Sequence, residues 1–354
     1  MALFAVVSVA ALLLGFVIPD HERMTVWFRD TGYYGILAAF CLWALALWRV
    51  VMRARTRPQT PAGAEPTSPA WRRHGPALIV AIVLVALAFC AAPPRFRILY
   101  DEVNLMGLAQ GLYEDRKAWL PENGLFYGTE LTAFSHTMDK RPLAFPFLVT
   151  LLHASLGYDG NNGFVLNFLA AVAALFCLYL LLYRWLAPPF AWAGMLLLAA
   201  YPLFVLYAAS SGFEVLNLCF ALLAVLCLDR CAASRDPDDG RLLLATLLVL
   251  AQCRYESILF LLVLAPCIPA LLRREDWPGL GLPALLAPLL LLPVAWQLRL
   301  FSEPEEHQLA AGQSLFGLGH LLHNAGRAWE ALRGAEDVYL TVPVVFWTGL
   351  AGLC

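Results

Sequence analysis

The chain has 354 residues, of which 61% are hydrophobic and only 14% are charged, and its mean hydropathy is +0.68. Soluble globular domains contain about 45–50% apolar and about 25% charged residues, so this composition excludes an ordinary soluble protein. The net charge of −2 gives no indication of nucleic-acid binding, and the charged residues are informative only through their positions.

The apolar residues are concentrated in runs long enough to form membrane-spanning helices. These runs cover residues 3–18, 33–52, 76–92, 163–186, 190–209, 213–228, 280–300 and 338–353. The stretch 242–272 is too long for one span, and because Arg254-Tyr255-Glu256 interrupts it, we expect two short helices that meet there. The last run ends with the chain, which suggests a missing C-terminal region. The pattern predicts an all-α polytopic membrane protein.

Arginine positions predict the orientation of these helices. The linker at residues 53–75 carries five arginines among Pro, Ala, Thr and Ser: Arg53, Arg55, Arg57, Arg72 and Arg73. Such a segment is typical of a disordered cytoplasmic linker. The next span would then leave the membrane on the external side, and residues 94–157 would form an external loop.

This orientation divides the chain into four parts. Residues 1–52 form an N-terminal two-helix membrane region, and residues 53–75 form the linker. Residues 76–300 form the main transmembrane region with its external loop. Residues 301–354 form an external segment and a final span, which the end of the chain would truncate.

The short apolar stretch 142–156 decides the sidedness of everything that follows it. If it spans, five later arginines lie outside, against the positive-inside rule: Arg230, Arg235, Arg241, Arg273 and Arg274. If it is a juxtamembrane helix on the external face, all five lie inside. We adopt the second interpretation, which also places Glu214 and the Arg254-Tyr255-Glu256 triplet on the same side as Asp101.

The pair Asp101-Glu102 follows the third apolar run and opens a helical pattern that continues along the external loop. The helix dipole favours ionised carboxylates at such an N-terminus. A carboxylate there can accept the proton of an acceptor hydroxyl, or bind a divalent cation such as Mg or Mn that activates it. Asp101 is the candidate metal ligand. Capping of a surface helix is the simpler alternative for the pair.

Further charged residues stand at the predicted external face. Lys140 and Arg141 precede an apolar helix, where they would bind a lipid phosphate or, alternatively, extend to lipid headgroups. Glu214 follows Ser-Ser-Gly at the start of a span and would face the same cavity. Arg254 and Glu256 would bind substrate or form an internal ion pair at the helix break.

Together these motifs resemble the GT-C superfamily of polyprenyl-phosphate-dependent glycosyltransferases, in particular the protein O-mannosyltransferase-like and lipid A aminoarabinose transferase-like group. The resemblance covers about residues 94–272. It rests on Tyr100-Asp101-Glu102-Val103-Asn104, Lys140-Arg141-Pro142-Leu143, Glu214 and Arg254-Tyr255-Glu256. The chain departs from the family pattern in having two spans before the third apolar run, and in having Arg141 where the first of two prolines is common.

The resemblance implies a GT-C-like helix bundle with juxtamembrane helices in its external loop. It implies that Asp101 is the catalytic base, Glu102 its neighbour in the acceptor or metal environment, and Glu214 a second acid, while Lys140 and Arg141 hold the donor phosphate. The reaction would invert the anomeric carbon. The donor would be a polyprenyl-phosphate sugar and the acceptor an envelope glycan, lipid or protein, at the periplasmic face of a bacterial inner membrane.

Two other functions are compatible with the same residues. A transporter or flippase of lipid-linked saccharides would carry polar residues through the middle of several spans. Most spans here have apolar interiors, which favours the transferase. In a non-enzymatic membrane assembly protein, the same acids would only cap helices and form ion pairs.

Overall fold

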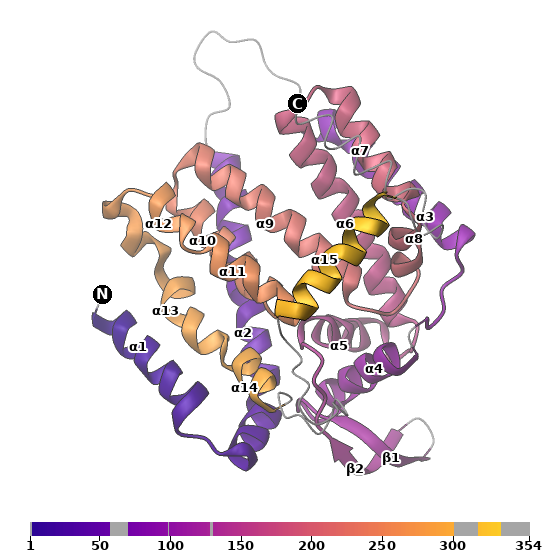
Figure 1. The fold of residues 1–354 in the computed structure, drawn as a ribbon, viewed down its shortest axis with the longest axis vertical. Coiled ribbons are helices and arrows are strands. Elements are labelled where there is room, and N and C mark those ends of the chain that lie inside the picture. Colours follow the sequence, from indigo (N-terminus) through magenta and orange to yellow (C-terminus); the bar gives the residue numbers. More distant parts are fainter. Residues whose placement is uncertain (1, 57–69, 98, 128–129, 301–317, 334–354) are drawn as a thin grey trace. The chain divides into compact units, whose positions relative to one another are not determined.

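The computed structural model describes residues 2–56, 70–97, 99–127, 130–300 and 318–333, and it divides into two compact units, Met1–Phe301 and Ser302–Cys354. The second unit is described only for helix α15 (Leu318–Arg333), and the predicted last span, 338–353, lies outside the described residues. The first unit is predominantly helical (Figure 1).

The elements of the first unit follow one another in this order: α1 (Ala2–Leu12), η1 (Leu13–Val17), α2 (His21–Thr56), α3 (Ala70–Ala91), α4 (Leu99–Glu114), β1 (Leu120–Tyr127), β2 (Glu130–Thr137), α5 (Ala144–Leu156), α6 (Asn162–Trp185), α7 (Pro188–Ala200), α8 (Pro202–Ala208), α9 (Glu214–Ser234), α10 (Pro237–Leu250), η2 (Tyr255–Ser257), α11 (Ile258–Leu264), α12 (Cys267–Leu271), η3 (Arg274–Leu280), α13 (Gly281–Leu290) and α14 (Leu292–Leu300).

Five helices in the described part of the chain are long and apolar enough to cross a membrane, or six if one bent pair counts as a single span. This confirms the prediction of a polytopic helical membrane protein. The bent pair is α7 and α8, which meet at 67°. The bend falls at Pro202, which has no N–H to continue the helical hydrogen bonds. The predicted first span is a shorter apolar helix, Leu3–Val17, of about 22 Å.

The linker predicted at residues 53–75 is helical at both ends, which corrects that prediction. Helix α2 continues to Thr56, and α3 begins at Ala70. Arg53 is held in place by acids at the start of α10, so its segment is part of the folded unit. Residues 57–69 lie outside the described residues.

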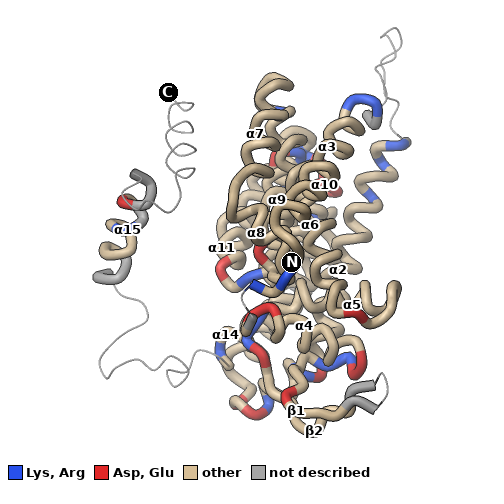
Figure 2. The backbone as a smooth tube through the Cα atoms, turned by 90° about the vertical axis from the view of Figure 1, so that its right-hand side faces the viewer, with Lys and Arg blue, Asp and Glu red and all other residues tan. Residues whose placement is uncertain are grey.

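Charged residues gather toward the two ends of the helices of the first unit, and the stretch between is largely uncharged (Figure 2). At one end, the last turns of α2, α6 and α9 meet the first turn of α10. The ion pairs there are Arg53 with Asp236, Asp238 and Asp239, Arg230 with Asp239, Arg241 with Asp238, and Arg184 with Asp229. The sequence interpretation did not identify this cluster.

The arginines that decided the predicted topology lie at this same end. Arg230 and Arg241 pair with acids of α10, and Arg235 ends α9. Arg273 and Arg274 begin η3, which packs on α10. The structure therefore groups these arginines as the positive-inside argument expected.

Helix α5 lies at the opposite end of the unit, together with α4 and the hairpin (Figure 1). The N–H of Ala144 donates to the carbonyl of Gln252, 3.1 Å away, and His153 contacts Asn162 at the start of α6. With 13 residues, α5 is about 20 Å long, which is less than the hydrocarbon thickness of a bilayer. The short length of α5, and the contacts that hold both of its ends at this end of the unit, agree with a juxtamembrane helix rather than a span.

Residues 120–127 and 130–137 form a pair of antiparallel strands, here called the hairpin, that was not predicted. Strands β1 and β2 pair from Leu120 with Thr137 to Tyr127 with Glu130. The hairpin packs on α4 because two glycines of that helix leave room for it: a Cβ at Gly107 would collide with Leu120, and one at Gly111 would collide with the carbonyl oxygen of Trp119. The hairpin and α4 thus form one packed element within residues 94–157.

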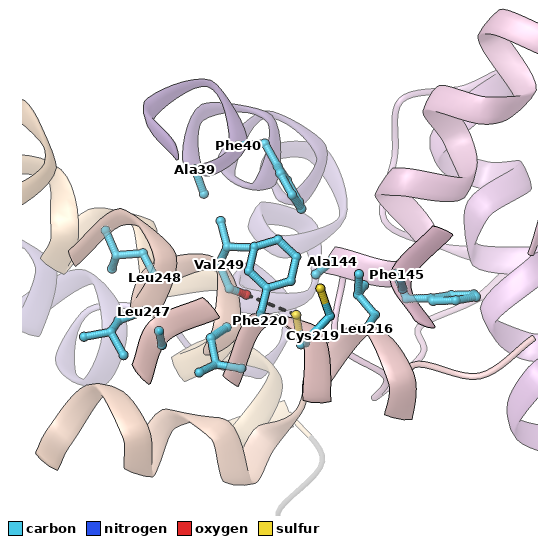
Figure 3. Packing of buried hydrophobic residues seen from close by; sticks show 14 of the residues in the cluster. Ala39, Phe40, Ala144, Phe145, Leu216, Cys219, Phe220, Leu247, Leu248 and Val249 are labelled. Carbon is cyan, nitrogen blue, oxygen red and sulfur yellow. Dashed lines mark hydrogen bonds between the residues drawn. The ribbon is translucent and has the colours of Figure 1, made fainter. Parts of the chain in front are cut away.

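Aromatic contacts anchor α5 to the core of the helical unit. Figure 3 shows Phe40 of α2, Phe220 of α9 and Val249 of α10 close together, with Phe145 of α5 to one side of them. The Phe40 ring stacks on the buried Phe147 ring at 5.3 Å, and its edge meets Phe220 at 6.1 Å. Since α5 follows directly on Lys140 and Arg141, this packing fixes the position of those residues as well.

His153 forms a buried junction between α5 and α6. Its Nδ1 accepts hydrogen bonds from the Asn162 amide at 2.8 Å and the Asp159 N–H at 3.4 Å, and its ring lies against Tyr113 and Tyr158. Burial lowers the pKa of His153 below 6.5, although the Asp159 carboxylate and the Gly157 backbone oppose that effect. Protonation would place a new N–H against two donors.

We expect acid to destabilise the protein through His153. Because the folded pKa is lowered, the unfolded chain binds more protons between the two values. The stability from neutral His153 is complete above pH 6.5 and is lost as the pH falls through the folded-state pKa. Thermal unfolding at pH 7.5 and pH 5.0 should show a smaller pH effect in His153→Gln than in wild type. The exposed His136→Gln should retain the wild-type effect, and an unchanged slope in His153→Gln would contradict the assignment.

Candidate functional site

A pocket of about 160 Å³ lies at the end of the first unit that contains α4 and α5. It forms where the start of α4, the loop before α5, the start of α9 and the turn after α10 meet. Its lining consists of Asp101, Lys140, Arg141, Pro142, Phe213, Arg254, Tyr255 and Glu256. The structure thus brings together most of the predicted site residues, which come from three separate stretches of the sequence. Glu102 and Glu214 each adjoin a lining residue without lining the pocket.

Arg141 is the buried centre of this arrangement. Only 5% of its surface is exposed, and its guanidinium forms ion pairs with Asp101 through Nη2 and with Asp139 through Nη1, the latter at 2.6 Å. The Asn104 amide, with its oxygen turned toward Arg141, accepts from Nη1 at 2.9 Å. The Tyr100 ring lies 5.0 Å from the guanidinium carbon. These contacts fix the guanidinium at one wall of the pocket.

The environment keeps Arg141 charged. Burial by itself would lower its pKa, but the carboxylates of Asp101 and Asp139 outweigh burial and raise the pKa above its ordinary value. The main chain is fixed too, because the Gln297 amide donates to the carbonyl of Arg141 at 2.8 Å. Arg141 therefore contributes a permanent, rigidly held positive charge to the wall of the pocket, shared with two carboxylates.

Asp101 is the acid that both lines the pocket and meets solvent. It lies in the first turn of α4, as the sequence predicted, and 44% of its side chain is exposed. Leu105, Leu108 and Leu112 follow Asp101 at helical spacing on the same face of α4 and are fully buried, so this face packs against the protein and Asp101 stands at its exposed end. One carboxylate oxygen pairs with Arg141. A substrate in the pocket could therefore reach the Asp101 carboxylate.

Glu102 points into the protein instead of the pocket and is only 2% exposed. Its carboxylate accepts hydrogen bonds from the N–H groups of Arg97 and Ser211, each at 3.2 Å. It thereby ties the segment before α4 to the segment between α8 and α9. This position favours a structural role for Glu102, and its assignment to the acceptor or metal environment stays a prediction.

Glu214 begins α9, directly after the pocket residue Phe213. It is partly buried, and the charged side chains that interact with it electrostatically are Arg254, Glu102 and Asp101. The predicted second acid is thus close to the site without lining it. Its catalytic assignment also stays a prediction.

Arg254 and Glu256 form the other wall of the pocket. Their side chains pair at 3.2 Å and are 38% and 67% exposed. The Arg254 guanidinium lies 5.3 Å from the Phe213 ring. An exposed ion pair contributes about 0–1 kcal/mol, so a ligand can separate these two residues at little cost. The pair occupies the predicted helix break, but it is exposed to the pocket rather than internal.

The charges of the lining residues suit an anionic ligand better than a metal cation. Lys140, Arg141 and Arg254 supply three positive charges against the two carboxylates of Asp101 and Glu256. Among the described residues, no group of three or more His, Cys, Asp or Glu side chains could hold a metal ion. The proposal that Asp101 binds a divalent cation remains untested.

Several residues of the site were not identified from the sequence. The most important is Asp139, which is 4% exposed and holds Arg141 through both its Nη1 and its backbone N–H. A carboxylate directly before a basic pair is the only sequence signal for it. Phe213 and Gln297 come from apolar segments, in which nothing distinguishes them from packing residues.

Comparisons of the chain with protein-family models, with curated proteins and with solved structures found no match.

Proposed function

We propose that the protein is a membrane glycosyltransferase that moves a sugar from a polyprenyl-phosphate donor to an envelope glycan, lipid or protein. One observation carries the proposal: a pocket beside the apolar helices joins a solvent-accessible carboxylate, Asp101, to three cations. The cations suit the phosphate of a membrane-resident donor, and the carboxylate suits an acceptor hydroxyl.

The residues divide the reaction between them. Lys140 and Arg254 are the first contacts for the donor phosphate, since Arg141 already binds two carboxylates. Asp101 takes the proton of the acceptor hydroxyl while the hydroxyl oxygen attacks the anomeric carbon of the sugar. The bond from that carbon to the phosphate oxygen breaks, the polyprenyl phosphate leaves with the electron pair, and the configuration is inverted. Positive side chains beside the phosphate stabilise the charge that develops there.

The arginine-rich end of the unit supports an external site. Under the positive-inside rule, the end with Arg53, Arg230 and Arg241 faces the cytoplasm. The pocket is at the opposite end and would open to the external or periplasmic side. ATP is not supplied there, which favours a preactivated lipid-linked donor.

Transfer from a labelled polyprenyl-phosphate sugar tests this function. Membranes that contain the protein should move the label into a glycan, lipid or protein fraction and release one polyprenyl phosphate per sugar transferred. Membranes without the protein should not. If the label instead crosses the bilayer while it remains on the polyprenyl lipid, the protein is a flippase and the transferase proposal is wrong.

A further inference from the structure

A second pocket, of about 240 Å³, lies near the arginine-rich end of the first unit, between α2, α10 and α13. Its lining consists of Leu42, Leu45, Ala46, Arg49, Arg241, Gly281, Leu282 and Pro283. The wall is mostly apolar, and the two arginines are its only charged residues. The proposed transferase reaction does not use this pocket.

The lining residues of α2 form one stripe along the helix. Leu42, Leu45 and Arg49 recur at three- and four-residue intervals and so share a face. From Arg49 to Leu42 the stripe extends about 10 Å along the helix. Arg49 precedes Arg53 of the charged end by one turn, so the stripe runs from the charged end into the apolar flank.

The apolar part of the stripe is open. Leu45 is 41% exposed and Leu282 is 54% exposed. Both belong to helices that are long and apolar enough to cross a membrane. In a bilayer, acyl chains would cover these side chains.

Nearby carboxylates neutralise the positive charges of the two arginines only in part. Within the described residues, Arg49 has no hydrogen bond or ion pair and is exposed. Arg241 pairs with Asp238, but Asp238 also lies 3.8 Å from Arg53 and is therefore shared. An arginine guanidinium binds phosphate oxygens through paired N–H donors. The charged end of the pocket is thus complementary to a phosphate group.

We propose that this pocket binds one anionic glycerophospholipid. The phosphate lies between Arg49 and Arg241, and an acyl chain lies along Leu42, Leu45 and Leu282. A soluble phosphate compound matches the arginines but leaves the apolar wall exposed. The acyl chain of a zwitterionic lipid can contact the apolar wall, but its ammonium group would be repelled by the two guanidinium groups.

Native mass spectrometry of the full chain in mild detergent tests the site. Titration with phosphatidylglycerol should give one tightly bound lipid per chain. Phosphatidylcholine with the same acyl chains, and glycerol 1-phosphate without them, should each bind at least about tenfold more weakly. Equal binding of phosphatidylcholine would overturn the charge assignment, and equal binding of glycerol 1-phosphate would overturn the lipid assignment.

Variants separate a specific site from general attraction to headgroups. Arg49→Gln should weaken phosphatidylglycerol binding by about tenfold. Arg55→Gln is the matched control: it is also an exposed arginine of α2, but six positions further on it points about 240° around the helix. Leu282→Trp should fill the pocket and block binding with both arginines intact. Binding unchanged in Arg49→Gln, or weakened equally in Arg55→Gln, would overturn the proposal.

Discussion

Asp101→Asn should lower sugar transfer by about 10²- to 10⁴-fold, the usual contribution of a general base. The amide cannot take a proton from the acceptor hydroxyl, whereas the carboxylate can. The fold should persist, because Asn can still accept a hydrogen bond from Arg141, and Asp139 still neutralises that arginine. The measurement is the rate of label transfer from a polyprenyl-phosphate sugar in membranes with equal amounts of each protein.

Glu122→Gln provides the matched control for this loss. Glu122 is an acid of the same loop, but it lies exposed on β1, outside the pocket. Its variant should transfer sugar at the wild-type rate. Full activity of Asp101→Asn, or an equal loss in Glu122→Gln, would remove Asp101 from the mechanism.

Arg141→Leu should reduce the free energy of unfolding by about 3–5 kcal/mol, as expected when one partner of a buried ion pair is removed. Arg141 is 5% exposed and Asp139 is 4% exposed. Without the guanidinium, the Asp139 carboxylate remains buried with its charge unpaired. Chemical denaturation in mixed micelles measures this loss.

A double-mutant cycle distinguishes the unpaired charge from lost packing. Asp139→Asn combined with Arg141→Leu should be more stable than Arg141→Leu alone, because no charge then remains buried. Arg273→Leu is the control: its pair with Glu275 is 75% and 73% exposed and should contribute about 0–1 kcal/mol. If the double variant is no more stable than Arg141→Leu, the ion pair is not the source of the effect.

The helices were predictable because long apolar runs have few alternatives to a helix in a membrane. The helix that begins near Asp101 and the break at Arg254-Tyr255-Glu256 were also predictable, since charges and helical periodicity mark both. The hairpin was not. Pro121 and the Asn123-Gly124 pair lie within β1, where they indicate a turn, and the pairing is irregular at these residues. Its position depends on the glycines of α4, which is a tertiary effect.

The pocket could be predicted in part because charged residues beside apolar runs are conspicuous. Asp101, Arg141 and Arg254 were each identified in this way, and a topology argument placed them on one side. The roles of Asp139 and Glu102 could not be derived in the same way. Asp139 stands in a polar stretch where acids are common, and the inward direction of Glu102 depends on the backbone of Ser211, which is 109 residues away in the chain.

The ion pair between Arg53 and Asp239 has a consequence for biosynthesis. The two residues are 186 positions apart, and Trp43 of the same helix donates to Thr246, 203 positions later. At about 5–20 residues per second, the ribosome needs about 10–40 s to make the intervening chain. Through that interval, α2 is in the membrane before its acidic partners have been synthesised. Helix α10, and after it α13 and α14, can pack on α2 only once they have been synthesised, so assembly of the unit is completed late in translation.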